Sequence, residues 1–481
     1  MTGIAEGEIG MKSAIIGALG AGLLTTAASA TETRPLTADQ QEFRDLFEEL
    51  VETDTTLSKG SCTLAAERMA DRLRKAGFAE DQLTLFATPE NPREGGLVAV
   101  YPGTSKTLKP LLAIAHIDVV EAKPEDWERD PFTLYEEDGY FYARGVADDK
   151  AMAASLVDTL IRFSKSGYRP KRAVKVALTC GEETNGAFNG VEWLVNNRRD
   201  LIDAEFAINE GGGGTADANG KVVEQTIQVG EKIFANYVLE FTNPGGHSSV
   251  PRPDNAITQL AHALVKIGDH RFPLEFNETT RTYFRVAGAG RRDAIGDAMV
   301  ALANDPTDSA AEAVVNADAF LHSNLRTTCV ATMLEAGHAR NALAQRAQAN
   351  VNCRIFPGNT IEAVGEELAR VVGDEGLDIT ILEPRRPAPP SPPMDERILG
   401  PSRELVERYF PGVPLVPVMS NGYTDSTFLT AVGIPAYGVP GGWGDPDGNG
   451  VHGLNERISA ESLYVGRDFL FDLVKALASP E

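Results

Sequence analysis

The stretch from Leu111 to Ala154 constrains the fold more than any other part of the chain. It opens with an apolar run, residues 111–115, of the kind that forms a strand buried on both faces. His116 and Asp118 end this run, and side chains two positions apart point to the same side of a strand. The stretch closes on residues 145–150, GVADDK, where two adjacent carboxylates precede a helix start. This arrangement predicts half of a two-metal hydrolytic site.

Strands and helices alternate through the first half of the chain. Strands are predicted at residues 97–101, 111–115, 173–179 and 206–210, and helices within 36–77 and at 150–164 and 191–197. The alternation predicts an α/β fold, a mostly parallel sheet flanked by helices on both faces. Sites in such sheets lie beyond the carboxyl ends of the strands. His116 and Glu182 follow predicted strands and Glu210 ends one, so we expect them to lie at the same edge.

The pattern changes near residue 233. Strands are predicted at residues 234–241, 329–334, 347–356 and 377–382, and helices at 255–268 and 360–372. With residues 275–325 set aside as an insert, the order is β-α-β-β-α-β, a smaller two-layer α+β unit. The proline-rich residues 384–393 then return the chain to the first domain. We therefore predict an inserted lid domain, with boundaries as follows: signal peptide 1–30, catalytic domain 31–231 and 385–481, lid 232–384.

The last part of the chain completes the catalytic domain. A helix is predicted at residues 395–409, strands at 415–419 and 436–439, and a terminal helix at 465–477. A chain of 481 residues exceeds what a single core supports, which agrees with two domains. The net charge of −24 repels nucleic acid and anionic membrane surfaces. An anionic substrate would therefore need an arginine or lysine at the site itself.

The N-terminus has the features of an export signal. Lys12 precedes an apolar segment, residues 14–24, which runs into Ala28-Ser29-Ala30. Two glutamates in the first ten residues do not suit a signal, so Met11 could be the true start. We expect export to the periplasm or the medium, with the mature chain beginning near Thr31. The alternative is an uncleaved anchor, although no other stretch reaches the ~20 apolar residues of a membrane span.

The four cysteines are spread widely through the sequence. Cys62, Cys180, Cys329 and Cys353 form no CxxC motif and no Cys/His cluster, so a thiolate metal site is not expected. Cys329 and Cys353 lie in two strand-like runs and could pair in an oxidising compartment. Buried free thiols are the alternative.

Eight acidic or histidine side chains are candidates for metal chemistry. Zinc prefers histidine nitrogen and carboxylate oxygen, and two-metal sites use a carboxylate that bridges the ions. Two adjacent acids at a strand end, such as Glu182 and Glu183, repel each other unless one binds a cation. Gly211–Gly214 lack a following Gly-Lys-Ser/Thr, so we predict a flexible turn there and no phosphate loop. The candidates are His116, Asp118, Asp148, Asp149, Glu182, Glu183, Glu210 and His452.

Taken together, the motifs resemble those of a known family of zinc metallopeptidases. The family includes acetylornithine deacetylase, succinyl-diaminopimelate desuccinylase, aminoacylase, carboxypeptidase S and carnosine dipeptidases. The resemblance covers most of the chain beyond residue 30, and the NEGGG motif with Glu210 is most similar to the carboxypeptidase S branch. The motifs that carry it are AHIDVV, YARGVADDKAM, GEET, NEGGG, GGHSSVP, NCRIFPG and VHGLNE.

The resemblance implies a role for each metal-site residue. Asp148 would bridge two Zn²⁺ ions, with Co²⁺ or Mn²⁺ also possible, and its peptide bond to Asp149 would be cis. His116 and Glu210 would complete one metal site, and Glu183 and His452 the other. Glu182 would be the general base. Asp118 would accept a hydrogen bond from the far ring nitrogen of His116 and so fix its tautomer.

The resemblance also implies roles for three residues of the lid. His247 would stabilise the developing oxyanion, in its own subunit or in that of a homodimer partner. Arg354 would grip the substrate's terminal carboxylate, and Asn341 is a further candidate for the same pocket. The alternatives are that His247 caps a helix and that Arg354 is an ordinary surface residue.

The sequence thus predicts an exported two-zinc exopeptidase or deacylase. Its substrate would be a short peptide or an N-acyl amino acid with a free carboxylate beside the scissile amide. Two alternatives stay open: a hydrolase of non-peptide amides on the same scaffold, and a catalytically inactive binding protein.

Overall fold

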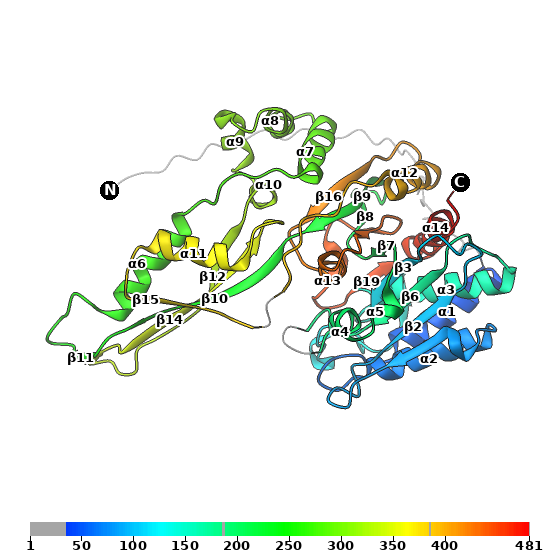
Figure 1. Ribbon diagram of the computed structural model, residues 1–481, viewed down its shortest axis with the longest axis horizontal. Coiled ribbons are helices and arrows are strands. Elements are labelled where there is room, and N and C mark those ends of the chain that lie inside the picture. The colour runs from blue at the N-terminus through cyan, green and yellow to red at the C-terminus, as the bar shows by residue number, and fades with distance from the viewer. Residues whose placement is uncertain (1–34, 185–187, 384–385, 481) are drawn as a thin grey trace, which may run out of the picture.

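The computed structural model describes residues 35–184, 188–383 and 386–480 as a catalytic domain with a long projecting lid (Figure 1). The predicted signal peptide, residues 1–30, lies outside the described residues. A ten-stranded sheet forms the centre of the catalytic domain, in the order β1-β2-β6-β3-β7-β17-β9-β8-β18, with β16 paired to β9. Its strands are β1 (Leu83–Phe86), β2 (Gly96–Tyr101), β3 (Leu111–His116), β6 (Val174–Thr179), β7 (Phe206–Asn209), β8 (Gly213–Ala216), β9 (Val222–Glu231), β16 (Leu415–Ser420), β17 (Ala436–Gly438) and β18 (Trp443–Gly444).

The middle of this sheet is parallel. β3 pairs parallel with β6 on one side and β7 on the other, and β7 pairs parallel with β17. All six residues of β3 are buried, as the apolar run predicted. Antiparallel pairs occur towards the edges, between β1 and β2, β2 and β6, and β8 and β9. The predicted α/β fold class is therefore confirmed.

Helices cover both faces of the sheet because β3 alternates its apolar side chains between two cores. Leu111, Ala113 and Ala115 pack in the core of one face, and Leu112 and Ile114 in the core of the other. The first face carries α1 (Ala38–Val51), α2 (Cys62–Lys75), α3 (Lys150–Ser166), α12 (Glu396–Tyr409) and α14 (Ala460–Ala478). The second face carries α4 (Gly190–Asn197), α5 (Arg199–Ile202) and α13 (Ser426–Ala431).

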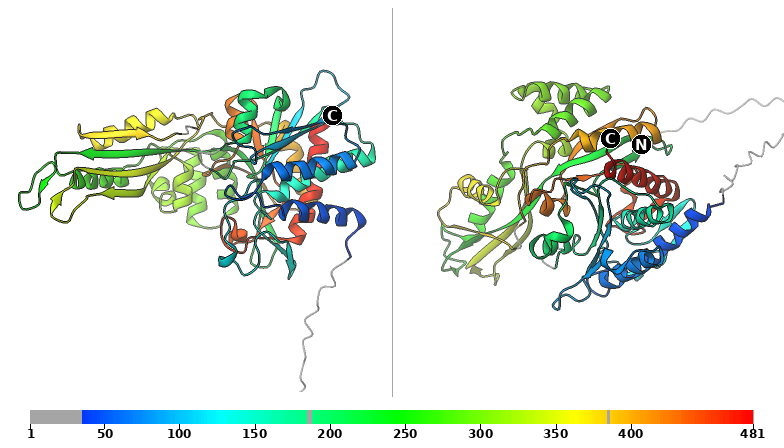
Figure 2. Two further views of the ribbon diagram at one scale, coloured as in Figure 1. Left: turned by 90° about the horizontal axis from the view of Figure 1, so that it is seen from below. Right: turned by 45° about the vertical axis from the view of Figure 1, so that its right-hand side comes forward.

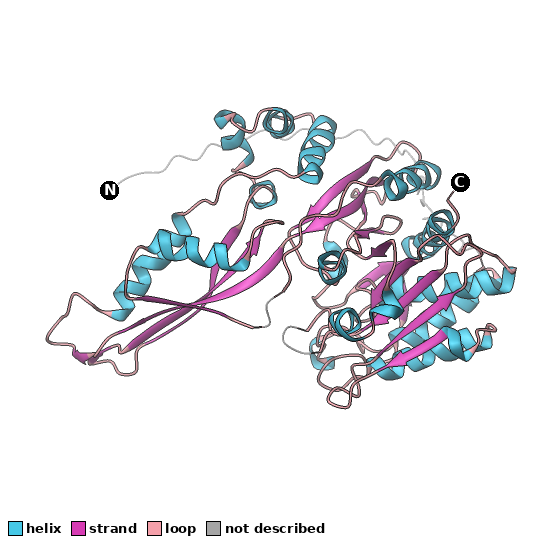
Figure 3. Ribbon diagram, viewed as in Figure 1, coloured by secondary structure: helices cyan, strands magenta, loops and turns pink. Residues whose placement is uncertain are grey.

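The lid is a four-stranded antiparallel sheet with helices on one face (Figure 3). Its order is β12-β14-β10-β15, and only Lys232 separates β9 of the catalytic sheet from β10 of the lid. The burial of β10 alternates residue by residue, which is expected of a sheet covered on one face. The elements are β10 (Ile233–Thr242), α6 (Ala256–Asp269), β12 (Thr328–Ala336), β14 (Arg346–Ile355), α11 (Ile361–Val372) and β15 (Leu377–Ile381).

Residues 275–325, set aside as an insert, form a helical group with a small core of its own. Phe284, Met299 and Leu302 lie in that core. The group stands beside β16 and α12 in Figure 1, where the lid leaves the catalytic domain. It consists of α7 (Glu278–Gly290), α8 (Ala294–Asn304), α9 (Ser309–Val315) and α10 (Ala319–Asn324).

Short strands complete the fold and correct one prediction. Gly213 and Gly214, predicted as part of a flexible turn, begin β8; both pair with β9, and Gly214 also pairs with β18. A side chain at position 214 would meet Gln225 at 2.4 Å, so the glycine permits this close approach. The remaining strands are β4 (Tyr135–Glu137), β5 (Tyr140–Tyr142) and β19 (Arg457–Ser459), which form one small sheet, and the pair β11 (Gly246–His247) and β13 (Ala342–Leu343).

Two disulfides join all four cysteines. Cys329 and Cys353 lie directly opposite each other on β12 and β14 and are bonded, so the first of the two alternatives holds. Cys62 and Cys180, 118 residues apart, form a second disulfide that the sequence did not predict. Across the described residues, no helix combines the length and the apolar character that a bilayer span requires.

Candidate metal and catalytic site

Five acidic or histidine side chains meet at the carboxyl edge of the parallel strands. His116 is the last residue of β3, Glu183 follows β6, and Glu210 follows β7 directly. Asp148 lies in the loop that leads to α3, and His452 in the loop before β19. Because β6, β3 and β7 are neighbours in register, their carboxyl ends bring side chains from distant parts of the sequence together.

Asp148 lies between the two histidines. Its Oδ1 is 3.0 Å from Nε2 of His116, and its Oδ2 is 3.2 Å from Nε2 of His452. The carboxylate of Glu183 lies 2.8 Å from His452, and that of Glu210 lies 3.6 Å from His116. The two carboxylate oxygens of Asp148 thus face different histidines. One histidine, His116, has Glu210 beside it, and the other, His452, has Glu183 beside it. This is the arrangement that a carboxylate bridging two ions requires.

The donor atoms are close enough to hold metal ions. Ligand atoms of His116, Asp148 and Glu183 all lie within 4.8 Å of one another, and so do those of His116, Asp149 and Glu210. Asp149 was a candidate in the sequence, but its position beside Glu210 was not predicted. One oxygen of its buried carboxylate has no hydrogen-bond partner in the described structure, as expected of an atom that a cation would satisfy. Histidine nitrogen and carboxylate oxygen suit zinc and similar divalent ions.

Burial and close contacts shift the pKa values of several groups at the site. Burial raises the pKa of Glu210 to about 8 and raises those of Glu182 and Asp149 well above their usual range. Burial also acts on Asp148, but hydrogen bonds from both histidines outweigh it, and the pKa of Asp148 is lowered. Hydrogen bonds with Asp148 and Glu183 raise the pKa of His452 to about 10. Divalent cations would replace these protons.

Asp118 supports the site differently from the prediction. The far ring nitrogen of His116, Nδ1, lies 3.0 Å from the main-chain carbonyl oxygen of Asp118 and 3.7 Å from its carboxylate. The carboxylate instead accepts a hydrogen bond from the backbone N–H of Glu183, at 3.1 Å. The carbonyl oxygen therefore fixes the orientation of the His116 ring, and the side chain of Asp118 positions Glu183. The predicted cis peptide bond between Asp148 and Asp149 is confirmed.

Glu456 holds the Asp148 loop through the backbone, a role that the sequence did not reveal. Its carboxylate accepts hydrogen bonds from the backbone N–H groups of Gly145, Ala147 and Asp148 at 2.9, 2.9 and 3.2 Å. Glu456 lies four residues after His452 in VHGLNE. The loop that carries His452 is therefore hydrogen-bonded to the loop that carries Asp148. The VHGLNE motif includes Glu456, but nothing in the sequence indicates that its partners are the backbone N–H groups of the Asp148 loop.

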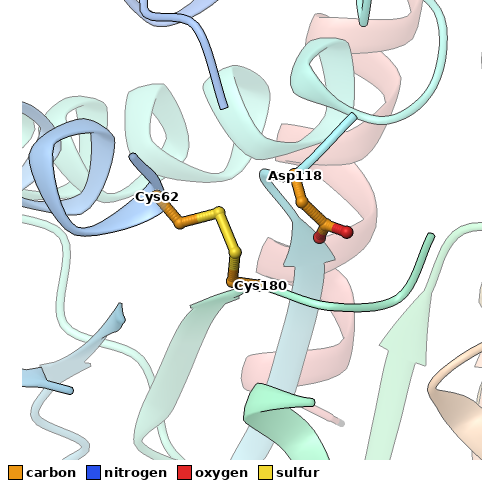
Figure 4. A group of neighbouring side chains, drawn as sticks. All are labelled: Cys62, Asp118 and Cys180. Carbon is orange, nitrogen blue, oxygen red and sulfur yellow. A yellow bond between two sulfur atoms is a disulfide. The ribbon is translucent and has the colours of Figure 1, made fainter. Parts of the chain in front are cut away.

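A disulfide anchors the catalytic loop after β6. Figure 4 shows Cys62 on α2 bonded to Cys180, with the carboxylate of Asp118 beside them. Cys180 immediately precedes Gly181-Glu182-Glu183. Although sulfur atoms and a carboxylate meet here within 4.8 Å, both sulfurs belong to the disulfide, so this group offers no thiolate ligands.

Two of the predicted lid residues do not reach the site of their own chain. His247 lies in β11, which pairs with β13 at the end of the lid farthest from the catalytic sheet (Figure 1). The left view of Figure 2 shows the same separation. Asn341 lies next to it, since its carbonyl oxygen accepts a hydrogen bond from Ser248 N–H at 3.0 Å. Both side chains are exposed. Within one chain Asn341 therefore lies far from Arg354, and a pocket that both residues share stays a prediction for a dimer.

Arg354 lies at the opposite end of the lid. It pairs with Phe234 near the start of β10, close to the junction with the catalytic domain, and its guanidinium stacks over the Phe234 ring at 5.3 Å. β14 spans ten residues, roughly 30 Å at ~3.3 Å per residue, between this end and the end near Asn341. Partial burial lowers the pKa of Arg354. In the described part of the chain no carboxylate forms an ion pair with it.

The fold and the clustered ligands define a metal-dependent hydrolase. Residues 112–476 match "Peptidase family M20/M25/M40". The chain belongs to this family, and the resemblance seen in its motifs is confirmed.

Individual relatives agree with this assignment. A Homo sapiens protein described as N-fatty-acyl-amino acid synthase/hydrolase is 31% identical over 441 residues, which cover 88% of this chain and 85% of the relative. Aminoacylase-1 of Mus musculus is 27% identical over 391 residues, 79% of this chain and 83% of the relative. The solved structure of an M20 family metallo-carboxypeptidase from Sulfolobus solfataricus has a TM-score of 0.67 at 19% identity, covering 92% of this chain and 100% of that one. This last similarity shows the fold alone.

Proposed function

We propose that the chain is a two-metal hydrolase of short peptides or N-acyl amino acids that cleaves the amide bond next to a free carboxylate. The observation that carries this proposal is the position of Asp148 between His116 and His452, at 3.0 and 3.2 Å. His116, Asp148 and Glu210 would hold one ion, and Asp148, Glu183 and His452 the other. Zinc fits this donor set best, and Co²⁺ or Mn²⁺ also fit it.

The bound ions and Glu182 would divide the work of hydrolysis between them. When bound, the two ions lower the pKa of water and polarise the scissile carbonyl. Glu182 follows β6 beside the ligands and would accept the proton that the attacking water loses. It would then pass this proton to the nitrogen of the leaving amine. Burial, which raises the pKa of Glu182, favours a carboxyl group that can both accept and release a proton.

Arg354 would bind the free carboxylate of the substrate. The chain carries a net charge of −24, so an anionic substrate is repelled unless a local cation attracts it. Arg354 is half-buried at the base of the lid and faces no carboxylate of the described chain, so its guanidinium is available for a bidentate contact.

A homodimer would bring His247 and Asn341 to the site of a second copy. Both side chains are exposed and adjacent at the far end of the lid. β12 is an outer strand of the lid sheet and exposes Val330, Met333 and Leu334 with fractions of 63, 72 and 64%. Exposed apolar side chains on an outer strand favour pairing with another chain. We expect Met333→Glu to shift the sedimentation coefficient from dimer to monomer, whereas Val223→Glu, an exposed residue of β9, should not.

We also propose that the protein is exported. Disulfides persist in oxidising compartments and are rare in a reducing cytosol. All four cysteines are joined in two disulfides.

A substrate panel tests the proposed function. Purified protein is assayed with dipeptides, N-acyl amino acids and the same compounds carrying a C-terminal amide, each with and without a chelator. We expect chelator-sensitive hydrolysis, with the amidated compounds slower by about 10- to 100-fold because a charged hydrogen bond is lost. Equal rates on amidated compounds would indicate a hydrolase of other amides. No turnover of any compound by metal-loaded protein would indicate a binding protein.

A further inference from the structure

A cavity of about 390 Å³ opens beside the proposed metal ligands. Its walls include Asp148 and Glu210 and extend to Leu463 and Leu470 of α14. The volume lies within the ~300–1,000 Å³ of small-molecule sites. All of its lining residues belong to the catalytic domain, so the cavity does not depend on the position of the lid.

Among the described residues, the charges of the cavity lie at the metal end, on Asp148, Asp149 and Glu210. Asn449 and Ser462 are the uncharged polar residues of the described wall, and the rest of it is apolar or glycine. The larger apolar side chains come from α3, α14, β18, β19 and the loop after β17, and they include Met152, Val439, Trp443, Ile458, Leu463 and Leu470. No arginine or lysine of the described chain lines the cavity, so an anionic or zwitterionic group buried there would be left unpaired at a large cost in free energy. The cavity suits an uncharged, apolar group.

Small residues keep the cavity open on two sides. Gly211–Gly214 line one wall, and Gly466, in the middle of α14, lines the other. Glycine inside a helix is less favourable than alanine, so its presence here needs a packing reason. A Cβ atom at position 466 would lie 3.3 Å from the backbone of Gly442 in the opposite loop. Ser462 fixes that loop, since it accepts a hydrogen bond from Trp443 N–H and donates one to the Trp443 carbonyl oxygen, both at 2.8 Å.

From this geometry we infer that the cavity binds a long, unbranched acyl chain of an N-acyl amino acid. This inference rests on the proposed function and assigns the two ends of the substrate to opposite sides of the metal site. Arg354 of the lid takes the carboxylate, and the apolar cavity takes the acyl chain. In the reaction, water adds across the amide: its oxygen bonds to the acyl carbon, the C–N bond breaks, and the nitrogen gains a proton. A fatty acid and an amino acid are released.

A chain-length series tests the inference. N-acetyl, N-octanoyl and N-dodecanoyl derivatives of one amino acid are compared by kcat/KM. Each buried methylene is worth roughly a fourfold gain in affinity, so kcat/KM should rise steeply with length until the cavity is full. Hydrolysis of all three at equal kcat/KM would overturn the inference and leave the proposed function standing.

Two substitutions at one position should act in opposite directions. Leu470→Trp fills the cavity and should reduce the dodecanoyl-to-acetyl ratio of kcat/KM at least tenfold, and Leu470→Ala should move the preferred length upwards. Val465→Trp, on α14 but outside the cavity, is the matched control and should leave the ratio unchanged. Thermal unfolding identifies any variant that fails to fold. Unchanged ratios in both folded Leu470 variants would overturn the inference.

A binding measurement separates the inference from the proposed function. Decan-1-ol, which has the apolar chain of the acyl group and no carboxylate, is titrated calorimetrically into metal-free protein, where no hydrolysis takes part. We expect saturable binding of one equivalent that Leu470→Trp weakens at least tenfold. If no amide is hydrolysed by metal-loaded protein, the proposed function fails, while this titration still decides the inference. Absence of binding would overturn the acyl-chain site.

Discussion

Arg144 and Glu456 form a buried ion pair, 2.8 Å between Nη1 and Oε2, across 312 residues of sequence. Their side chains are exposed by only 3 and 1%. Arg144 also donates a hydrogen bond to the Gly453 carbonyl oxygen at 2.7 Å and lies over the Trp127 ring. The pair therefore fastens the loop that carries His452 to the loop that carries Asp148. We conclude that it sets the distance between these two proposed ligands.

Removing the charge of Glu456 should loosen both loops. In Glu456→Gln an amide NH₂ group would face either Arg144 or backbone N–H donors, and the buried Arg144 charge would lose its carboxylate partner. Breaking one side of a buried ion pair costs about 3–5 kcal/mol. We expect a loss of that size in the free energy of unfolding and at least tenfold weaker metal binding by calorimetry. Glu128→Gln, an exposed glutamate, is the control, and equal metal affinity in both variants would refute the positioning role.

Arg354 should matter for substrate binding and little for folding. Arg354→Ala removes the proposed partner of the substrate carboxylate, so KM should rise about 10- to 100-fold with a smaller change in kcat. Arg346→Ala, at the other end of β14, is the matched control because its side chain is exposed. Steady-state kinetics on an N-acyl amino acid and on its amide provide the check. An equal effect of Arg354→Ala on both compounds would show that it does not bind the carboxylate.

The two disulfides should contribute unequally to stability. In the chain-entropy description the stabilisation grows with the closed loop, giving about 5 kcal/mol for the 118-residue separation and about 3 kcal/mol for the 24-residue one. The contribution of each disulfide to the free energy of unfolding is measured by denaturant unfolding of two double variants, Cys62→Ala/Cys180→Ala and Cys329→Ala/Cys353→Ala. Of the two disulfides, only Cys62–Cys180 adjoins Glu182, so its removal should also lower kcat. A larger loss of kcat in the lid variant would contradict this account.

The stability of the protein should fall as pH rises through the range in which Glu231 titrates. Burial raises the pKa of Glu231 from 4.5 to about 8, and its Oε1 has no hydrogen-bond partner in the described structure. Between these values the folded protein holds a proton that the unfolded chain has released. The free energy of unfolding therefore loses nothing from Glu231 below pH 4.5, and the loss is complete above about pH 8. Between these values it falls by at most about 1.4 kcal/mol per pH unit.

A neutral substitution removes this contribution. Glu231→Gln keeps an acceptor for the hydrogen bonds from Gln228 and Thr424 but cannot ionise. Denaturant unfolding at pH 5 and pH 7 should show a smaller loss of stability in Glu231→Gln than in the wild type. Parallel losses in both proteins would contradict the assignment.

The sequence predicted the parts of the site that follow from parallel strands. His116 and Glu210 stand at the ends of apolar runs, and the carboxyl ends of neighbouring parallel strands lie together whatever separates them in sequence. The lid sheet was equally predictable, since β10 alternates buried and half-buried residues along its length.

The parts that were missed depend on contacts that leave no periodic pattern. Glu456 bonds backbone N–H groups, which every residue type except proline offers, so its partners cannot be identified from sequence. Cys62 and Cys180 are 118 residues apart in elements of different type. His247 lies far from its own site because lid length and direction are tertiary properties, which the GGHSSVP motif does not encode.

The most direct test of the central claim is the metal content and turnover of wild type and Glu182→Gln measured on the same preparations. The account predicts two divalent ions per chain in both proteins, with hydrolysis reduced by about 10²- to 10⁴-fold only in the variant, because Glu182 moves protons and holds no metal. Fewer than two ions in the active wild type, or full activity in Glu182→Gln, would contradict it.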